Sequence, residues 1–187
     1  NFIYDNAITT VSLTNNDNGV YMYGQIGEVY GNSIYNNTIT VTIGSGFFLQ
    51  ENIHHNSIYN NTITTTTGKG IEIDRNNFEN LISDNVITTN GANANGINFD
   101  GSISASYSNS IYNNVITTSN SGSHGIYINQ NVYSNRIYGN SITTQSSNAA
   151  YGIYLQDNIN DNVFYRNNIS SFAAAIVING SVQSVTE

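Results

Sequence analysis

Apolar and polar residues follow a pattern that recurs every 24 to 31 residues along this chain. Each repeat opens with Asn-x-Ile-Tyr-x-Asn-x-Ile-Thr-Thr, continues through a polar loop of variable length and then reads Gly-Ile-x-Ile. Residues 32–40 recur unchanged at 56–64 and with one substitution at 109–117. A period of this length is typical of solenoids, in which each repeat forms one coil.

Within a repeat, the spacing of the apolar residues indicates strands. The two isoleucines of the opening motif lie five residues apart with single outward residues beside them, which fits two short strands joined by a tight bend. In Gly-Ile-x-Ile, strict alternation points two side chains of each repeat inward. These inward pairs are Ile71 and Ile73, Ile97 and Phe99, Ile126 and Ile128, and Ile153 and Leu155.

We therefore predict an all-β fold, a right-handed parallel β-helix of about seven coils with three short strands per coil. The prediction treats residues 1–187 as a single β-helix domain, which could be a fragment of a longer solenoid or one subunit of a filament. The coils begin at Asn1, Asn32, Asn56, Asn80, Asn109, Asn135 and Asn162.

The repeated asparagines are expected to stack in ladders along the helix axis. Asn tolerates left-handed backbone angles at bends, and its amide both donates and accepts hydrogen bonds. The coil-opening asparagines form one column. A second column holds Asn6, Asn37, Asn61, Asn85, Asn114, Asn140 and Asn167, and a less complete third holds Asn52, Asn76, Asn131 and Asn158.

Composition and charge narrow the function classes. Only 9% of residues are charged, the formal net charge is −8, and four residues are basic. This balance argues against nucleic acid and anionic membranes as partners and favours cations or neutral sugars. There is no Cys, and no apolar run approaches the roughly 20 residues that span a bilayer, so membrane insertion is not expected.

The motif Asn-x-Ile-x-x-Asn-x-Ile followed by Gly-Ile-x-Ile resembles the parallel β-helix repeat of the pectate-lyase-like superfamily. The resemblance covers the whole chain and implies the fold. It does not imply one activity, because that superfamily includes polysaccharide lyases, glycoside hydrolases, esterases, phage tailspikes and noncatalytic surface proteins.

Three carboxylates are candidates for a metal or acid/base site. Asp74 and Asp100 are expected in one column, one coil apart, with Glu72 pointing outward nearby and Glu51 as a further oxygen ligand from the adjacent coil. Such a group could bind a hard cation such as Ca²⁺. The same column continues through Gln50, Asn129 and Gln156, so an ordinary polar face is the alternative. No other cofactor is indicated.

Comparison with the polygalacturonases gives only partial agreement. Asn98-Phe99-Asp100-Gly101 is similar to their Asn-x-Asp segment, and Ser123-His124-Gly125 is similar to their Gly-His-Gly segment, but the chain has no Arg-x-Lys. A complete lyase or hydrolase residue set is therefore absent, and the sequence leans towards a protein that is not an enzyme. His54 and His55 are adjacent at a bend, where we expect them to face opposite ways and not to share a metal.

Aromatic residues form an outward stripe at the fourth position of six coils. Such a stripe could hold a sugar or a protein, or could simply stabilise the sheet. Its members are Tyr4, Tyr35, Tyr59, Tyr112, Tyr138 and Tyr165. Four sequons would permit glycosylation in an exported protein. They begin at Asn36, Asn60, Asn168 and Asn179.

These observations favour an extracellular or cell-surface, noncatalytic structural or adhesive β-helix. The last repeat, residues 162–187, has the length of a complete coil, and no polar cap is evident at either end, so end-to-end self-association into a filament is expected. The alternative is a polysaccharide-binding or polysaccharide-degrading domain that uses the face of Glu72, Asp74 and Asp100 or the tyrosine stripe.

Overall fold

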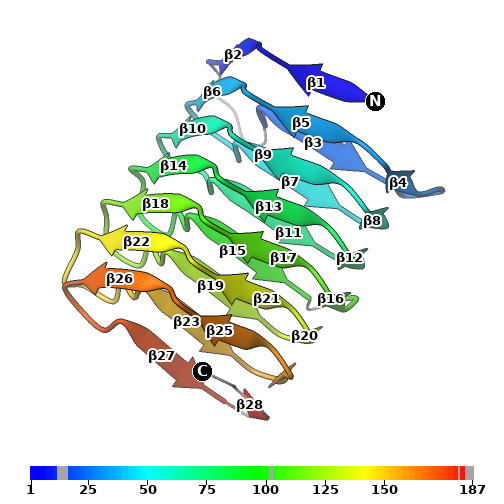
Figure 1. The fold of residues 1–187 in the computed structure, drawn as a ribbon. Helices are drawn as coiled ribbons and strands as arrows, with labels where there is room; N and C mark the ends of the chain where they lie inside the picture. The colour runs from blue at the N-terminus through cyan, green and yellow to red at the C-terminus, as the bar shows by residue number, and fades with distance from the viewer. Residues whose placement is uncertain (12–16, 102, 181, 184–187) are drawn as a thin grey trace.

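The computed structural model describes residues 1–11, 17–101, 103–180 and 182–183. Every element in these residues is a β-strand, and the strands form four parallel sheets that stack along one axis as a right-handed parallel β-helix (Figure 1). Each sheet contains seven strands, one from each repeat. The sequence prediction of the fold is confirmed.

The two strands of the opening motif build sheets A and B, which face the viewer in Figure 1. Sheet A contains β1 (Phe2–Tyr4), β5 (Ser33–Tyr35), β9 (Ser57–Tyr59), β13 (Leu81–Ser83), β17 (Ser110–Tyr112), β21 (Arg136–Tyr138) and β25 (Val163–Tyr165). Sheet B contains β2 (Ala7–Thr10), β6 (Thr38–Val41), β10 (Thr62–Thr65), β14 (Val86–Thr89), β18 (Val115–Thr118), β22 (Ser141–Thr144) and β26 (Asn168–Ser171).

Sheets C and D complete each coil, with sheet C lying behind sheets A and B in Figure 1. Sheet C contains β3 (Val20–Tyr23), β7 (Phe47–Gln50), β11 (Ile71–Asp74), β15 (Ile97–Asp100), β19 (Ile126–Asn129), β23 (Ile153–Gln156) and β27 (Ile176–Asn179). Sheet D contains β4 (Val29–Tyr30), β8 (Ile53–His54), β12 (Asn77–Phe78), β16 (Ser106–Tyr107), β20 (Val132–Tyr133), β24 (Ile159–Asn160) and β28 (Val182–Gln183).

The expectation of three strands per coil was incomplete, because the two-residue strands of sheet D form a fourth side. Their first residue points inward, as the fully buried Ile53, Val132 and Ile159 show. Their second residue points outward and pairs with its equivalent in the next coil. Two residues are too few for a hydrophobic alternation to be recognised, so this segment resembled a bend in the sequence.

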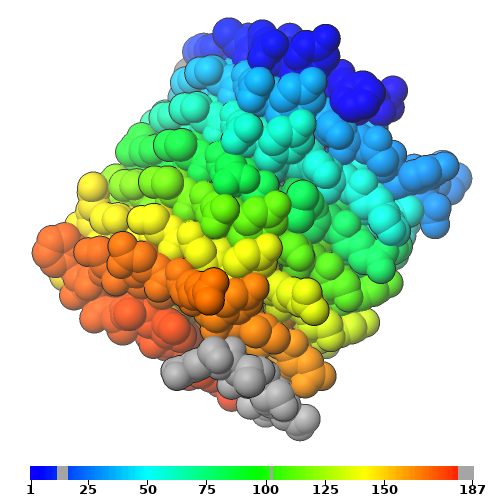
Figure 2. Space-filling model, viewed as in Figure 1, coloured from blue at the N-terminus to red at the C-terminus, as the bar shows by residue number. Residues whose placement is uncertain are grey.

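The core is a set of columns of apolar side chains from successive coils. Parallel pairing keeps equivalent residues in register, so Ile63 lies beside Ile39 and Ile87. All eight predicted inward residues of sheet C are at most 1% exposed. Because identical residues repeat at the strand spacing, each coil buries its apolar face against the coils on both sides. Figure 2 shows the outer surface as rows of side chains that follow the coils.

Two asparagine ladders run through all seven coils, as predicted. In each, the side-chain Nδ2 donates to Oδ1 of the next asparagine, at 2.8–3.1 Å in the ladder from Asn1 to Asn162 and at 3.0 Å in the ladder from Asn6 to Asn167. The third column is partial: Asn76 donates to Asn52, while Asn52 and Asn131 donate to backbone carbonyls.

Glycine directly precedes six of the seven sheet C strands, and Ala175 precedes β27. Two neighbours approach these glycines closely. A Cβ atom at Gly96 would overlap Cγ2 of Ile116 and lie 2.6 Å from the carbonyl oxygen of Gly125. This approach explains why Gly is needed at the first position of Gly-Ile-x-Ile.

The predicted last coil, residues 162–187, includes residues 181 and 184–187, which lie outside the described residues. None of the described residues forms a helix that could cross a membrane.

Candidate functional site

A groove follows the outer face of sheet C, between its outward side chains and the loops that precede each strand. It consists of two adjoining depressions of about 530 Å³ and about 410 Å³, which share Lys69, Glu72 and Asn93. The lining runs from Asn18 in the first coil to Tyr154 in the sixth. At the strand spacing this is about 24 Å along the axis.

The register of sheet C places the predicted acidic residues. Asp74 pairs with Asp100 in the neighbouring strand, as expected, and Glu72 pairs with Asn98 in the parallel column two residues earlier. Glu51 stands in the bend after β7 with a φ of 66°. The structure therefore brings Asp74 and Asp100 into one column, while Glu72 and Asn98 line the groove.

Each of these carboxylates already has polar partners. Glu72 accepts a hydrogen bond from Ser45 Oγ at 2.7 Å and forms an ion pair with Lys69 at 2.8 Å. Asp74 lies 3.3 Å from Arg75 Nε, and burial raises its pKa even though Arg75 lowers it. Asn129 Nδ2 lies 3.4 Å from Asp100. Among the described residues, no group of three or more His, Asp or Glu side chains is arranged to hold a metal, and a calcium role for this face stays a prediction.

His124 lines the smaller depression of the groove and is held among tyrosines. Its ring stacks on Tyr151 with 5.2 Å between centroids and lies 4.8 Å from the Tyr154 ring and 5.4 Å from the Tyr127 ring. Its Nδ1 accepts a hydrogen bond from the Tyr151 backbone N–H. Burial lowers the pKa of His124 to about 4, so the imidazole is neutral at pH 7.

A neutral imidazole that accepts a hydrogen bond at Nδ1 carries its proton at Nε2. His124 can therefore donate a hydrogen bond from Nε2 to a molecule in the groove. Asn95 and Asn98 are joined to each other at 2.9 Å, and Asn95 Oδ1 accepts from the His124 backbone N–H, which fixes this part of the wall. Sequence reasoning singled out His124 but missed Tyr151. Both residues directly precede the Gly of Gly-Ile-x-Ile in successive coils, and this shared position was the signal that could have identified the contact.

Aromatic rings stand at both ends of the groove. Phe48 lines one end and stacks on Tyr21 at 5.3 Å, while Tyr127 and Tyr154 line the other end and stack at 5.4 Å. Between them the outward residues are Glu72 and Asn98. The groove thus combines two aromatic platforms with a polar centre, an arrangement suited to ring-shaped ligands that carry hydroxyl groups.

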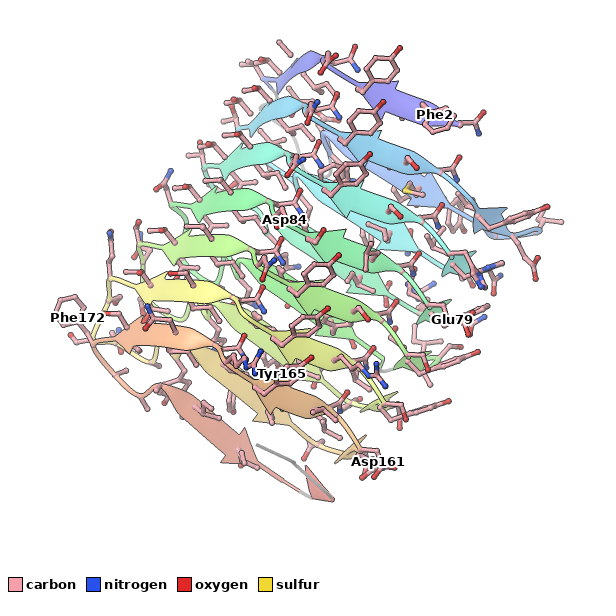
Figure 3. All side chains as sticks on the ribbon, in the orientation of Figure 1. Phe2, Glu79, Asp84, Asp161, Tyr165 and Phe172 are labelled. Carbon is pink, nitrogen blue, oxygen red and sulfur yellow. The ribbon has the colours of Figure 1, made fainter. Side chains whose placement is uncertain are left out.

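The predicted tyrosine stripe is present on sheet A, away from the groove. Its rings stack at 4.8–5.1 Å in two groups of three, which Ser83 separates. The stacking is confirmed, and a ligand role for the stripe stays a prediction. In Figure 3 these rings follow one another along sheet A, with Tyr165 labelled at the end of the row.

A second aromatic stack on sheet D escaped sequence analysis. Its rings stack at 4.6–5.3 Å. Each member stands two residues before a coil-opening asparagine, and this constant offset was the signal that could have identified it. The stack contains Tyr30, His54, Phe78, Tyr107 and Tyr133.

The four sequon asparagines are all exposed. Asn36 and Asn60 occupy the same bend in successive coils, with φ values of 57° and 54°. Asn179 donates to the Tyr154 hydroxyl group at 3.0 Å. Their positions are compatible with glycosylation, which stays a prediction.

No protein-family model matches the sequence, and no curated protein sequence matches it. Two solved structures have a similar fold. One is the A-module of mannuronan C-5 epimerase AlgE4 from Azotobacter vinelandii, with a TM-score of 0.63 and 17% identity over 100% of this chain and 57% of that one. The chain shares the parallel β-helix fold.

The second is the periplasmic alginate epimerase AlgG, with a TM-score of 0.52 and 18% identity over 99% of this chain and 50% of that one. The chain therefore spans about half the length of each of these proteins. At these identities the likeness shows the fold and does not assign an activity.

Proposed function

We propose that this chain is an extracellular, noncatalytic module that binds a linear neutral polysaccharide along the groove of sheet C. The continuous groove with an aromatic platform at each end is the observation that carries the proposal. An extended polymer could contact both platforms together, whereas a single sugar could contact one. The extracellular location is part of the same proposal, in which the ligand is a polysaccharide of a cell wall or extracellular matrix.

The charge of the groove supports a neutral ligand. Lys69 is the basic residue of its lining, and it is already paired with Glu72, while Asp100 adds a further acidic group. With a net charge of −8 over the chain, a polyanion would be repelled unless a cation bridged it. Neutral hydroxyl groups match the amides of Asn95 and Asn98 and the Nε2–H of His124.

Binding without turnover agrees with the hydrogen bonds and ion pair that Glu72 and His124 already make. Hydrolysis needs an acid and a base on opposite sides of the bond, and lyase chemistry needs a free base. Glu72 is engaged by Lys69 and Ser45, and the Nδ1 lone pair of His124 is used by the Tyr151 N–H. Neither residue is set up as a free base in this arrangement.

A polysaccharide-modifying enzyme is the second candidate. Both fold neighbours are named as epimerases of mannuronan or alginate, and His124 lies among the hydroxyl-bearing side chains of Tyr127 and Tyr154. Incubation with a panel of neutral and acidic polysaccharides, with and without Ca²⁺, followed by NMR of the polymer, separates the candidates. A change in polymer stereochemistry or length would establish the enzyme.

Affinity electrophoresis against the same panel tests binding. Tyr154→Ala should weaken retention by a neutral polysaccharide about tenfold, because one aromatic platform is lost. Tyr138→Ala is the matched control, since it removes a stacked tyrosine from sheet A and leaves the groove intact. If only Tyr138→Ala weakens binding, the ligand lies on the tyrosine stripe.

Filament formation is a separate proposal, which negative-stain microscopy tests.

A further inference from the structure

His54 and His55 approach each other at the corner between sheets D and A. Their Nδ1 atoms are 2.8 Å apart, and their rings are nearly perpendicular, at 80°. The sequence expectation that adjacent residues would face opposite ways was wrong here. His55 has a φ of 54°, and this left-handed residue turns the chain after β8 so that both rings lie on the same side.

Both rings are held in place by neighbours outside the pair. His54 is sandwiched between Tyr30 and Phe78, with centroid distances of 5.3 Å and 4.6 Å, and its side chain is only 12% exposed. His55 lies in the bend and its Nε2 is 2.9 Å from Glu79 Oε2. Glu79 occupies the equivalent bend one coil later, at the corner labelled in Figure 3.

The carboxylates determine where the ring protons lie. A carboxylate only accepts hydrogen bonds, so Glu79 requires a proton on Nε2 of His55. His54 Nε2 is buried without a hydrogen bond among the described residues, and Glu28 Oε2 lies 3.4 Å from it. A lone pair at this atom would face the Glu28 carboxylate, so a proton on His54 Nε2 is favoured as well.

With both protons on Nε2, the two Nδ1 lone pairs face each other at 2.8 Å and repel. A cation between them removes this repulsion. Histidines that bind a metal through one nitrogen commonly donate the other N–H to a carboxylate. Glu79 stands in that position for His55, and Glu28 lies 3.4 Å from the far nitrogen of His54. The Nδ1 pair, with a carboxylate beyond each ring, therefore has the organisation of a metal site.

We propose that Nδ1 of His54 and Nδ1 of His55 bind one divalent transition-metal ion, with Cu²⁺ and Ni²⁺ fitting best. At metal–nitrogen bonds of about 2.0 Å, ligands at right angles lie about 2.8 Å apart and tetrahedral ligands about 3.3 Å apart. The observed separation matches the right-angle geometry that Cu²⁺ and Ni²⁺ adopt. Water or an external ligand completes the site, which is accessible because the His55 side chain is 60% exposed.

Frozen-solution electron paramagnetic resonance with added Cu²⁺, together with calorimetric titration of Ni²⁺, tests the site in the full chain. We expect one ion per chain and hyperfine coupling to two imidazole nitrogens. His55→Asn should abolish both signals, and Asn is compatible with the left-handed bend. Glu79→Gln should weaken binding about 10-fold or more, because the far nitrogen loses its carboxylate.

The third histidine supplies the control. His124→Gln should leave copper and nickel binding unchanged, since His124 lies in the groove of sheet C. Unchanged binding in His55→Asn, or coupling to a single nitrogen, would overturn the proposal. The absence of metal binding to the native chain, together with ¹⁵N NMR evidence for a proton shared between the two Nδ1 atoms, would also overturn it. In that case a proton, and not a metal ion, lies between the two lone pairs.

Discussion

The backbone N–H of Tyr151 donates a hydrogen bond to Nδ1 of His124, with 3.1 Å between the two nitrogens. The two residues occupy equivalent positions in successive coils, each directly before the Gly of Gly-Ile-x-Ile. The same contact recurs where the Ser45 N–H donates to Asn18 Oδ1 and where the His124 N–H donates to Asn95 Oδ1. The Tyr151 contact fixes the tautomer of the imidazole and directs its remaining N–H away from Tyr151. This contact thus leaves the Nε2–H of His124 as the hydrogen-bond donor for a ligand.

This contact predicts a pH dependence of stability. The pKa of His124 is about 4 in the folded chain because of burial, against an ordinary value of 6.5. Between these values the unfolded chain binds more protons than the folded chain, so stability should fall as the pH is lowered from 6.5 towards 4. The contribution of the neutral imidazole is fully present above pH 6.5.

An NMR titration of the His124 ring and urea unfolding at several pH values measure the two effects. The ring resonance should titrate near pH 4. His124→Asn should reduce the loss of stability between pH 6.5 and pH 4, because the group that takes up the proton on unfolding is gone. A ring that titrates near pH 6.5 would contradict the burial of this imidazole.

The asparagine ladders should contribute strongly to stability. Asn85 is fully buried, and its Nδ2 donates to Ile58 O at 2.9 Å and to Asn114 Oδ1 at 3.0 Å. Its Oδ1 accepts from both nitrogens of Asn61. Asn85→Ala leaves several buried groups without partners, so we expect a loss of about 2–5 kcal/mol in the free energy of unfolding.

Urea denaturation measures this loss, and Asn90→Ala is the matched control. Asn90 is exposed and stands outside the ladders, so its replacement should change the free energy of unfolding by less than about 0.5 kcal/mol. Equal effects of the two substitutions would show that the ladder adds nothing specific to the fold.

The repeat made the fold predictable from sequence. The constant spacing from Asn32 to Thr40 in successive coils fixes strand register, and alternation in Ile71 and Ile73 fixes which side chains point inward. Both features depend only on local strand geometry and on pairing with an adjacent coil of similar sequence. The structure of one coil therefore predicts the structure of the next.

The candidate sites were less predictable because the repeat fixes positions and not the contacts of the side chains that occupy them. His124 and Tyr151 hold equivalent positions before Gly-Ile-x-Ile, and His55 occupies a left-handed bend that recurs in the other coils. The approach of His54 to His55 arises because both positions at this one corner carry imidazoles.

The acidic column of Asp74 and Asp100, with Asn129 beside Asp100, was located correctly because these residues lie on strands. The contact of Asp74 with Arg75 could only be seen in the structure.

The close approach at Gly96 predicts that this position excludes any side chain. Gly96→Ala would overlap Ile116 and crowd the Gly125 carbonyl group, and we expect a loss of about 1–3 kcal/mol in the free energy of unfolding. Gly27→Ala is the control, because no atom lies within 4 Å of a Cβ atom there. Thermal denaturation of both variants checks the prediction, and an unchanged midpoint for Gly96→Ala would contradict it.

Ser83 interrupts the tyrosine stripe, and a ring at this position should destabilise the chain. It lies between Tyr59 and Tyr112 in sheet A and is only 3% exposed, so neighbouring side chains already cover it. Ser83→Tyr would have to displace these neighbours, and we expect a loss of about 1–3 kcal/mol in the free energy of unfolding.

Removing a ring tests the stacking itself. Tyr138 stacks on Tyr112 and on Tyr165, so Tyr138→Ser should lower the free energy of unfolding by about 0.5–1.5 kcal/mol. Urea denaturation of both variants gives the two values. If Ser83→Tyr stabilises the chain instead, the side chains that cover Ser83 move aside at little cost and the expected overpacking is contradicted.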